Sequence, residues 1–93
     1  MSYERKVSDT LSKPSEAALI DLIKEDIEQQ DVLVKAKESA INGLAQYYVD
    51  NNTPEKIKNI AIELSQYFVV FSKPRMAKIT KNLVDYIAKV PNT

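Results

Sequence analysis

Apolar residues recur along this chain at the three- and four-residue spacing of an amphipathic helix, and no segment alternates with the two-residue period of a strand. Short polar segments interrupt the pattern. Three of them contain a proline, which lacks a backbone N–H and disfavours a helical residue before it. The interruptions are residues 12–15, 29–31, 50–54 and 72–75. The sequence therefore predicts an all-α fold of about five helices.

The first two expected helices are short. Tyr3, Val7 and Leu11 recur every four residues and predict one narrow apolar stripe. After the first break, Glu16 supplies the negative charge favoured in a first helical turn, and the second helix should fade near residues 29–31. Its apolar face comprises Leu19, Ile20, Leu22, Ile23 and Ile27.

A longer third helix should follow, with Asp31 as its N-cap and an end near Val49. Its apolar arc is broad, which implies contact with two neighbouring helices. Gly43 lies inside this helix, where glycine costs about 1 kcal/mol relative to alanine. We therefore expect another helix to approach closely at Gly43. Tyr47 and Tyr48 are expected in the core, with their hydroxyls reaching the surface.

Thr53 and Pro54 suit the N-cap and first position of a fourth helix. This helix is expected to continue through residues 67–71, an aromatic segment that we assign to the core. Ile62 and Val69 fall on roughly the opposite side. The fourth helix should therefore be covered on two faces, as a middle layer would be.

A fifth helix should begin at Pro74 and stop before Pro91, with one apolar arc and one basic arc. The basic arc begins where the helix macrodipole already places positive charge and acidic residues are usual. An acidic partner surface would be attracted there, so we predict a protein-binding site. The alternatives are a solvated face, or contact with the acidic second helix of the same chain. The candidate residues are Lys73, Arg75, Lys78 and Lys81.

The charge pattern argues against a generic binder of nucleic acid or membrane surfaces. The chain has 13 basic and 13 acidic side chains and no net charge, although residues 1–31 are acidic overall and residues 72–93 are basic overall. No apolar run approaches the roughly 18 residues that a membrane span needs. These features favour a cytoplasmic or nuclear protein.

The residue types also argue against an enzyme. The chain has no histidine and no cysteine, so it offers neither a disulfide framework nor a thiolate metal site. No nucleophile is paired with a base, and we predict no catalytic residue, cofactor or metal. The acidic residues Glu25, Asp26, Glu28 and Asp31 lack the glycine turn of a calcium loop, so we interpret them as a solvated face.

Connections of about two to six residues make antiparallel neighbours the default. Inner helices with broad apolar arcs favour stacked helical hairpins over a closed bundle, because each inner helix of a stack is covered on both sides. The fifth helix has no successor here. If the chain is part of a longer protein, the apolar arc of that helix is expected to meet a further helix.

Three segments carry a family resemblance: LIKEDIEQQD, VKAKESAINGLAQYYVDNNTPEKI and FSKPRMAKITKNLVDYI. Over about residues 22 to 90, the chain resembles the N-terminal region of the non-ATPase lid subunit 6 of the 26S proteasome regulatory particle. In that family, the last segment begins with Ser-Lys and continues as a helix of small, apolar and basic residues. Pro74 departs from the small or basic residue expected there. The matching residues are Ser72, Lys73, Ala77, Lys78 and Leu83.

The resemblance implies a right-handed α-solenoid of tetratricopeptide-like helical hairpins. Residues 1–93 would be the N-terminal part of a helical-repeat domain in a longer subunit, which in the family ends in a winged-helix module. The implied function is a non-catalytic scaffold in ubiquitin-dependent protein degradation, in the cytoplasm and nucleus. Its implied partners are the α-ring of the proteasome core particle and the ATPase and lid subunits of the regulatory particle.

Two other classes of function remain open from the residues alone. One is a free-standing helical adaptor that binds a peptide or helix in a groove. The other, RNA binding, is weaker, because the aromatic residues lie on the packing arcs and away from the basic one.

Overall fold

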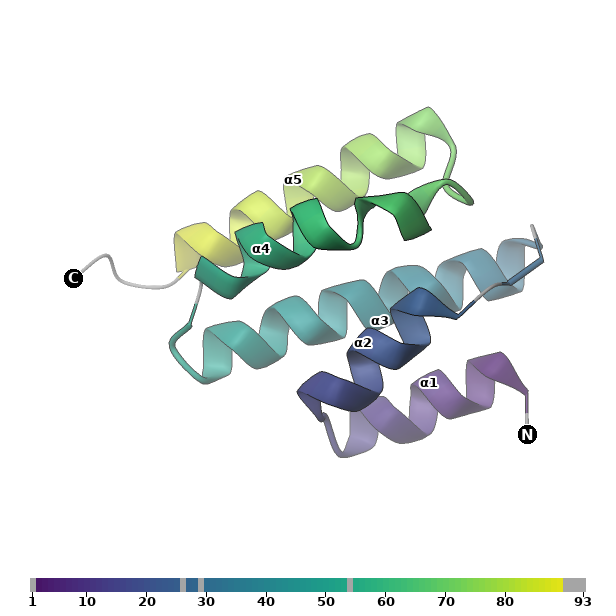
Figure 1. Ribbon diagram of the computed structural model, residues 1–93, viewed down its shortest axis with the longest axis horizontal. Coiled ribbons are helices and arrows are strands. Elements are labelled where there is room, and N and C mark those ends of the chain that lie inside the picture. Colours follow the sequence, from purple (N-terminus) through teal and green to yellow (C-terminus); the bar gives the residue numbers. More distant parts are fainter. Residues whose placement is uncertain (1, 26, 29, 54, 90–93) are drawn as a thin grey trace.

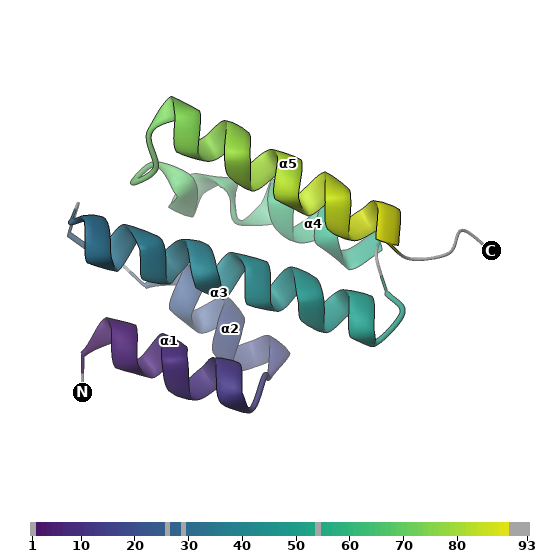
Figure 2. The same ribbon diagram turned by 180° about the vertical axis from the view of Figure 1, so that it is seen from behind.

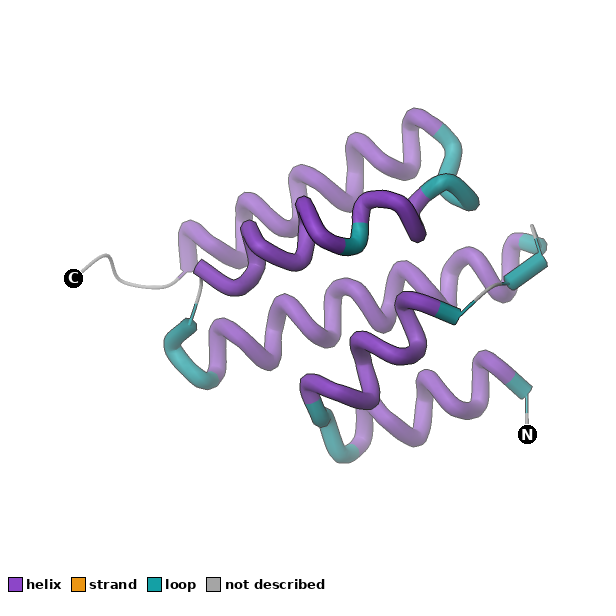
Figure 3. The backbone as a smooth tube through the Cα atoms, viewed as in Figure 1, coloured by secondary structure: helices purple, strands orange, loops and turns teal. Residues whose placement is uncertain are grey.

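The computed structural model describes residues 2–25, 27–28, 30–53 and 55–89. Within these residues the fold is all-helical, without a strand (Figure 3). The elements are α1 (Tyr3–Ser12), α2 (Glu16–Lys24), α3 (Asp31–Asp50), α4 (Glu55–Glu63), the 3₁₀-helix η1 (Ser65–Phe68) and α5 (Lys73–Lys89). The prediction of an all-α chain with five α-helices is confirmed.

The helices form two layers. Helices α1, α3 and α5 make one layer, and α2 and α4 make the other, as the front and back views show (Figures 1 and 2). Successive helices run antiparallel (Figure 1). The molecule measures 41 × 30 × 18 Å, and its shortest extent is less than about two helix diameters with side chains. This is the arrangement of helical hairpins placed side by side.

Helix α3 is the centre of the fold and contacts every other α-helix. Its broad buried arc, which includes the fully buried Ile41 and Leu44, confirms that it packs against neighbours on both sides. Gly43 faces α1: a Cβ added there would overlap Leu11 Cδ2. The predicted close helix approach at Gly43 is therefore confirmed.

Helix α1 is held by its apolar stripe and by one buried hydrogen bond. Tyr3 and Val7 are buried and Leu11 is half-buried, as predicted. The Tyr3 hydroxyl donates to the Leu22 carbonyl oxygen at 2.7 Å, which ties the start of α1 to the end of α2. Burial raises the pKa of the Tyr3 hydroxyl above its ordinary value of about 10, and the nearby charge of Glu25 raises it further.

Replacing Tyr3 with phenylalanine is expected to lower the free energy of unfolding by about 1 kcal/mol at neutral pH, because it removes this hydrogen bond. The difference from wild type should shrink above about pH 10. There the unfolded state releases the tyrosine proton while the folded state retains it, so wild-type stability falls as pH rises. Urea unfolding at neutral pH and near pH 11 checks both effects. Equal alkaline sensitivity of the two proteins would contradict the assignment to Tyr3.

The boundaries of α2, α3 and α5 differ from the predictions: α5 begins at Lys73, one residue before the predicted Pro74. Helix α2 ends at Lys24, before the predicted fade at residues 29–31. The N-cap of α3 is Gln30, and Asp31 is the first helical residue, where its charge is favourable to the macrodipole. Helix α5 extends to Lys89, so the predicted stop before Pro91 lies outside the described residues.

The turn between α3 and α4 is present as predicted. Asn52 has a φ of 59°, a left-handed conformation that asparagine tolerates better than most residues. The Thr53 N–H donates to the Tyr48 carbonyl at 2.8 Å, and the Thr53 hydroxyl donates to the same oxygen at 3.3 Å. The helical role predicted for Pro54 lies outside the described residues.

The fourth helix is not continuous, which corrects the prediction. Helix α4 ends at Glu63, and the chain tightens into η1 over Ser65–Phe68. Because no proline or glycine marks the break, we attribute it to the Ser65 hydroxyl, which donates to the Ile62 carbonyl at 2.9 Å and competes with the helical pattern. A 3₁₀-like geometry aligns residues three apart. Phe68 and Phe71 are both buried accordingly. Their rings pack edge to face, with 6.1 Å between the ring centroids.

The prediction that the fourth helix is covered on two faces is also wrong for the described residues. Ile62 is 75% exposed and Val69 is 82% exposed. No described residue covers these two side chains.

Candidate interaction surfaces

Three of the four predicted basic residues form an exposed surface on α5. Lys73, Lys78 and Lys81 are exposed and make no ion pair with another described residue. Lys73 opens the helix, and Lys78 and Lys81 lie three residues apart further along it. We refer to these three residues as the basic surface. No acidic residue lies in the first turn of α5, so the positive end of the helix adds to the charge of Lys73.

The fourth predicted residue, Arg75, is half-buried and paired within the chain. Its Nη1 donates to Glu38 Oε2 of α3 at 2.7 Å, and the two side chains are 27% and 11% exposed. The basic arc thus pairs with an acid of the same chain, but on the third helix and not on the acidic second helix. Sequence reasoning did not identify Glu38, because the two residues are 37 positions apart and no local pattern joins them.

An apolar groove runs between α4, η1 and α5, and we call it the open groove. Its lining includes Ala61, Phe68, Met76, Leu83 and Val84, together with the charged side chain of Lys58. Leu83 is buried, but Met76 is half-buried and Val84 is 57% exposed. The apolar arc of α5 is therefore incompletely covered by the described chain.

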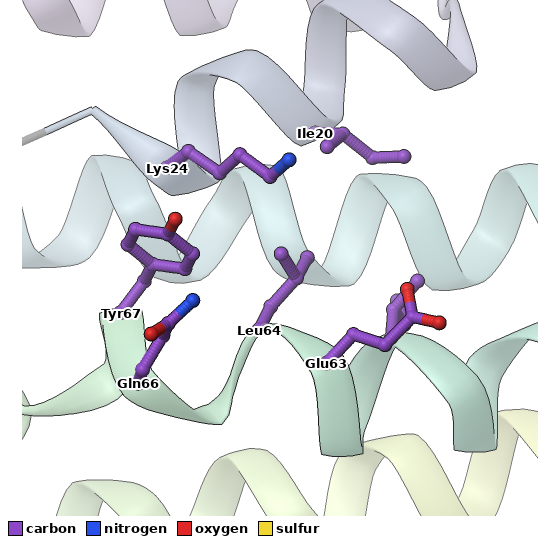
Figure 4. A pocket seen from close by; sticks show the side chains of 7 residues that line it. Ile20, Lys24, Glu63, Leu64, Gln66 and Tyr67 are labelled. Carbon is purple, nitrogen blue, oxygen red and sulfur yellow. The ribbon is translucent and has the colours of Figure 1, made fainter.

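A second recess, of about 190 Å³, lies between α2 and the α4–η1 segment. Figure 4 shows Ile20 and Lys24 on one side of it, and Glu63, Leu64, Gln66 and Tyr67 on the other. Leu64 is buried, while Lys24 and Glu63 are exposed. Charges of opposite sign thus flank an apolar floor, and the recess contains no nucleophile–base pair.

The acidic residues near the end of α2 are solvent-facing. Glu25 Oε1 lies 3.5 Å from Lys6 Nζ, and Glu28 accepts a hydrogen bond of 2.8 Å from the Gln30 side chain. Among the described residues, no three acidic side chains converge as a metal site. Asp26 lies outside the described residues. No helix in the described ranges is long and apolar enough to cross a membrane.

Comparison with known proteins links the whole chain to one family. A family model described as the 26S proteasome regulatory subunit RPN6 N-terminal domain matches residues 2–93. A curated relative, the 26S proteasome non-ATPase regulatory subunit 11 homolog of Arabidopsis thaliana, is 26% identical over 99 residues. That match covers 100% of this chain and 23% of the relative. No solved structure gave a significant match.

Proposed function

Because this chain belongs to the RPN6 N-terminal domain family of 26S proteasome regulatory subunits, we propose that it is a non-catalytic scaffold that helps hold the regulatory particle on the core particle. The partners would be the α-ring of the core particle and the ATPase and lid subunits, in the cytoplasm and nucleus. The chain corresponds to about a quarter of its curated relative, so this role concerns one region of a larger subunit.

The observation that carries the proposal is the basic surface on α5. Its three lysines are exposed and make no ion pair within the described chain, and Lys73 lies at the positive end of the 17-residue helix α5. Side chains and helix terminus would together attract a carboxylate-rich surface. Arg75 is excluded from this surface because Glu38 already neutralises it.

Reversing Lys78 and Lys81 to glutamate should weaken binding of the chain to purified core particles by roughly tenfold or more at low salt, because like charges would then meet. The loss should shrink between about 0.05 M and about 0.3 M salt, since salt screens exposed charges. The matched control reverses Lys13 and Lys35, two exposed lysines outside α5, with the same change in net charge. Unchanged affinity for the Lys78 and Lys81 variant, or an equal loss in the control, would refute the proposal.

The open groove supports a further part of the proposal: residues 2–89 would form the first tiers of a longer helical stack. In a longer protein, the helix after α5 would return along the groove, as α2 follows α1 and α4 follows α3. The groove also favours the competing function, an adaptor that binds a partner helix. In that case the groove would stay accessible in the longer protein.

A further inference from the structure

Two adjacent charged residues are buried on α3. Lys37 is 3% exposed and Glu38 is 8% exposed, which is unusual for charged side chains in a small domain. They reach different neighbours. Lys37 Nζ donates to the Glu25 carbonyl at the end of α2 at 3.4 Å, whereas Glu38 accepts from Arg75 in the first turn of α5. Two successive residues of α3 are therefore tied to different neighbours, one to the end of α2 and the other to the start of α5.

The Glu38–Arg75 pair differs in distance and burial from the other two ion pairs found among the described residues. Its nitrogen and oxygen lie 2.7 Å apart, and its side chains are 11% and 27% exposed. The Lys6–Glu25 and Lys56–Glu16 pairs measure 3.5 Å, with side chains 39% to 50% exposed. Exposed pairs stabilise a protein little, because water and salt screen them. A short, shielded, charge-assisted pair restrains its two helices much more strongly.

The start of α5 has few other polar restraints. Pro74 has no N–H, and the first turn contains no acidic side chain to bond its free N–H groups. The backbone bond from the Met76 N–H to the Ser72 carbonyl begins the helical ladder at 2.8 Å. Lys73 precedes Arg75 by two residues and Lys78 follows it by three. Any shift of this first turn would therefore move two of the three lysines of the basic surface.

We infer that Arg75 is a positioning residue, not a contact residue: its pair with Glu38 fixes the first turn of α5 on α3, so that Lys73 and Lys78 meet the acidic partner surface in one orientation. The inference rests on the proposed function. It assigns Glu38, a residue that cannot reach a partner, an effect on partner binding. If Arg75 instead contacted the partner directly, loss of the Glu38 charge would not weaken binding.

The deciding variant is Glu38→Gln, which breaks the ion pair but keeps the charge of Arg75. If Arg75 positions the lysines, affinity for purified core particles should fall by roughly three- to tenfold, the range typical of residues that act through others. If Arg75 contacts the partner, its release from Glu38 should leave the affinity unchanged or raise it, and the inference would be overturned. Glu16→Gln is the matched control, because it breaks an exposed pair between α2 and α4 that includes no residue of α5, and it should leave binding unchanged.

A charge swap provides a second test. Recovery of binding in the double variant is a result that a general loss of structure would not give. Arg75→Glu alone should weaken binding, and Glu38→Arg in the same chain should restore it by rebuilding the pair with the charges exchanged. Persistent weak binding of a folded double variant, checked by circular dichroism, would show that residue 75 itself must be positive at the interface. If the double variant does not fold, Glu38→Gln still decides. Failure of the proposed function looks different: the Lys78 and Lys81 reversal would then also bind as wild type.

Discussion

Leu44→Ala is expected to lower the free energy of unfolding by about 2–5 kcal/mol, a large share of the stability of a domain this size. Leu44 is fully buried near the middle of α3, the helix that contacts every other α-helix. The smaller side chain loses its transfer free energy and leaves a cavity between the two layers. Because both tiers pack on α3, the loss should appear as one cooperative transition at lower urea concentration.

Val32→Ala is the control for this prediction. Val32 belongs to the same helix but is 56% exposed, so its truncation should change the free energy of unfolding by less than about 0.5 kcal/mol. Urea unfolding followed by circular dichroism measures both variants. A Leu44→Ala protein with nearly wild-type stability, or one that unfolds in two separate steps, would contradict the central role of α3.

Much of the fold is readable from local patterns. The breaks at Pro14 and Pro74 and the asparagine turn before Pro54 separate the helices correctly, because these residues act on their own neighbours in the chain. Gly43 is a comparable case. A glycine inside a helix destabilises it relative to alanine. The close approach of Leu11 explains why glycine is present at this position, because a larger side chain would overlap Leu11.

Other features depend on geometry that periodicity does not contain. A helical wheel assumes 3.6 residues per turn, so it placed Phe68 and Phe71 correctly in the core but could not predict the tightening at η1. The exposure of Ile62 has another cause. Its position on the wheel suggests a second buried face, but none of the described residues covers it.

The candidate site, too, was only partly predictable from local sequence patterns. Sequence reasoning located the basic arc of α5 and the exposed lysines within it. It grouped Arg75 with them, because all four side chains carry the same charge on one arc. The pairing of Arg75 with Glu38 arises from the packing of α5 on α3, and so it became visible only with the tertiary structure.

The second prediction with a large expected effect is that the open groove is covered in a longer protein. Cysteine labelling measures this coverage. The chain has no cysteine, so Val84→Cys and Val32→Cys each introduce a single thiol. The two valines are 57% and 56% exposed, which makes Val32 a matched control on another helix. In the isolated 93-residue chain, both thiols should react with a maleimide reagent at similar rates.

The decisive comparison is the same labelling in a chimera, in which these 93 residues replace the corresponding region of the Arabidopsis relative. If the chain forms the first tiers of a longer helical stack, a following helix should cover the groove and slow labelling of the Val84→Cys variant by roughly tenfold or more, while the Val32→Cys variant stays reactive. Equal reactivity of the two variants in a folded chimera would contradict the account. So would protection of the Val84→Cys thiol in the isolated chain.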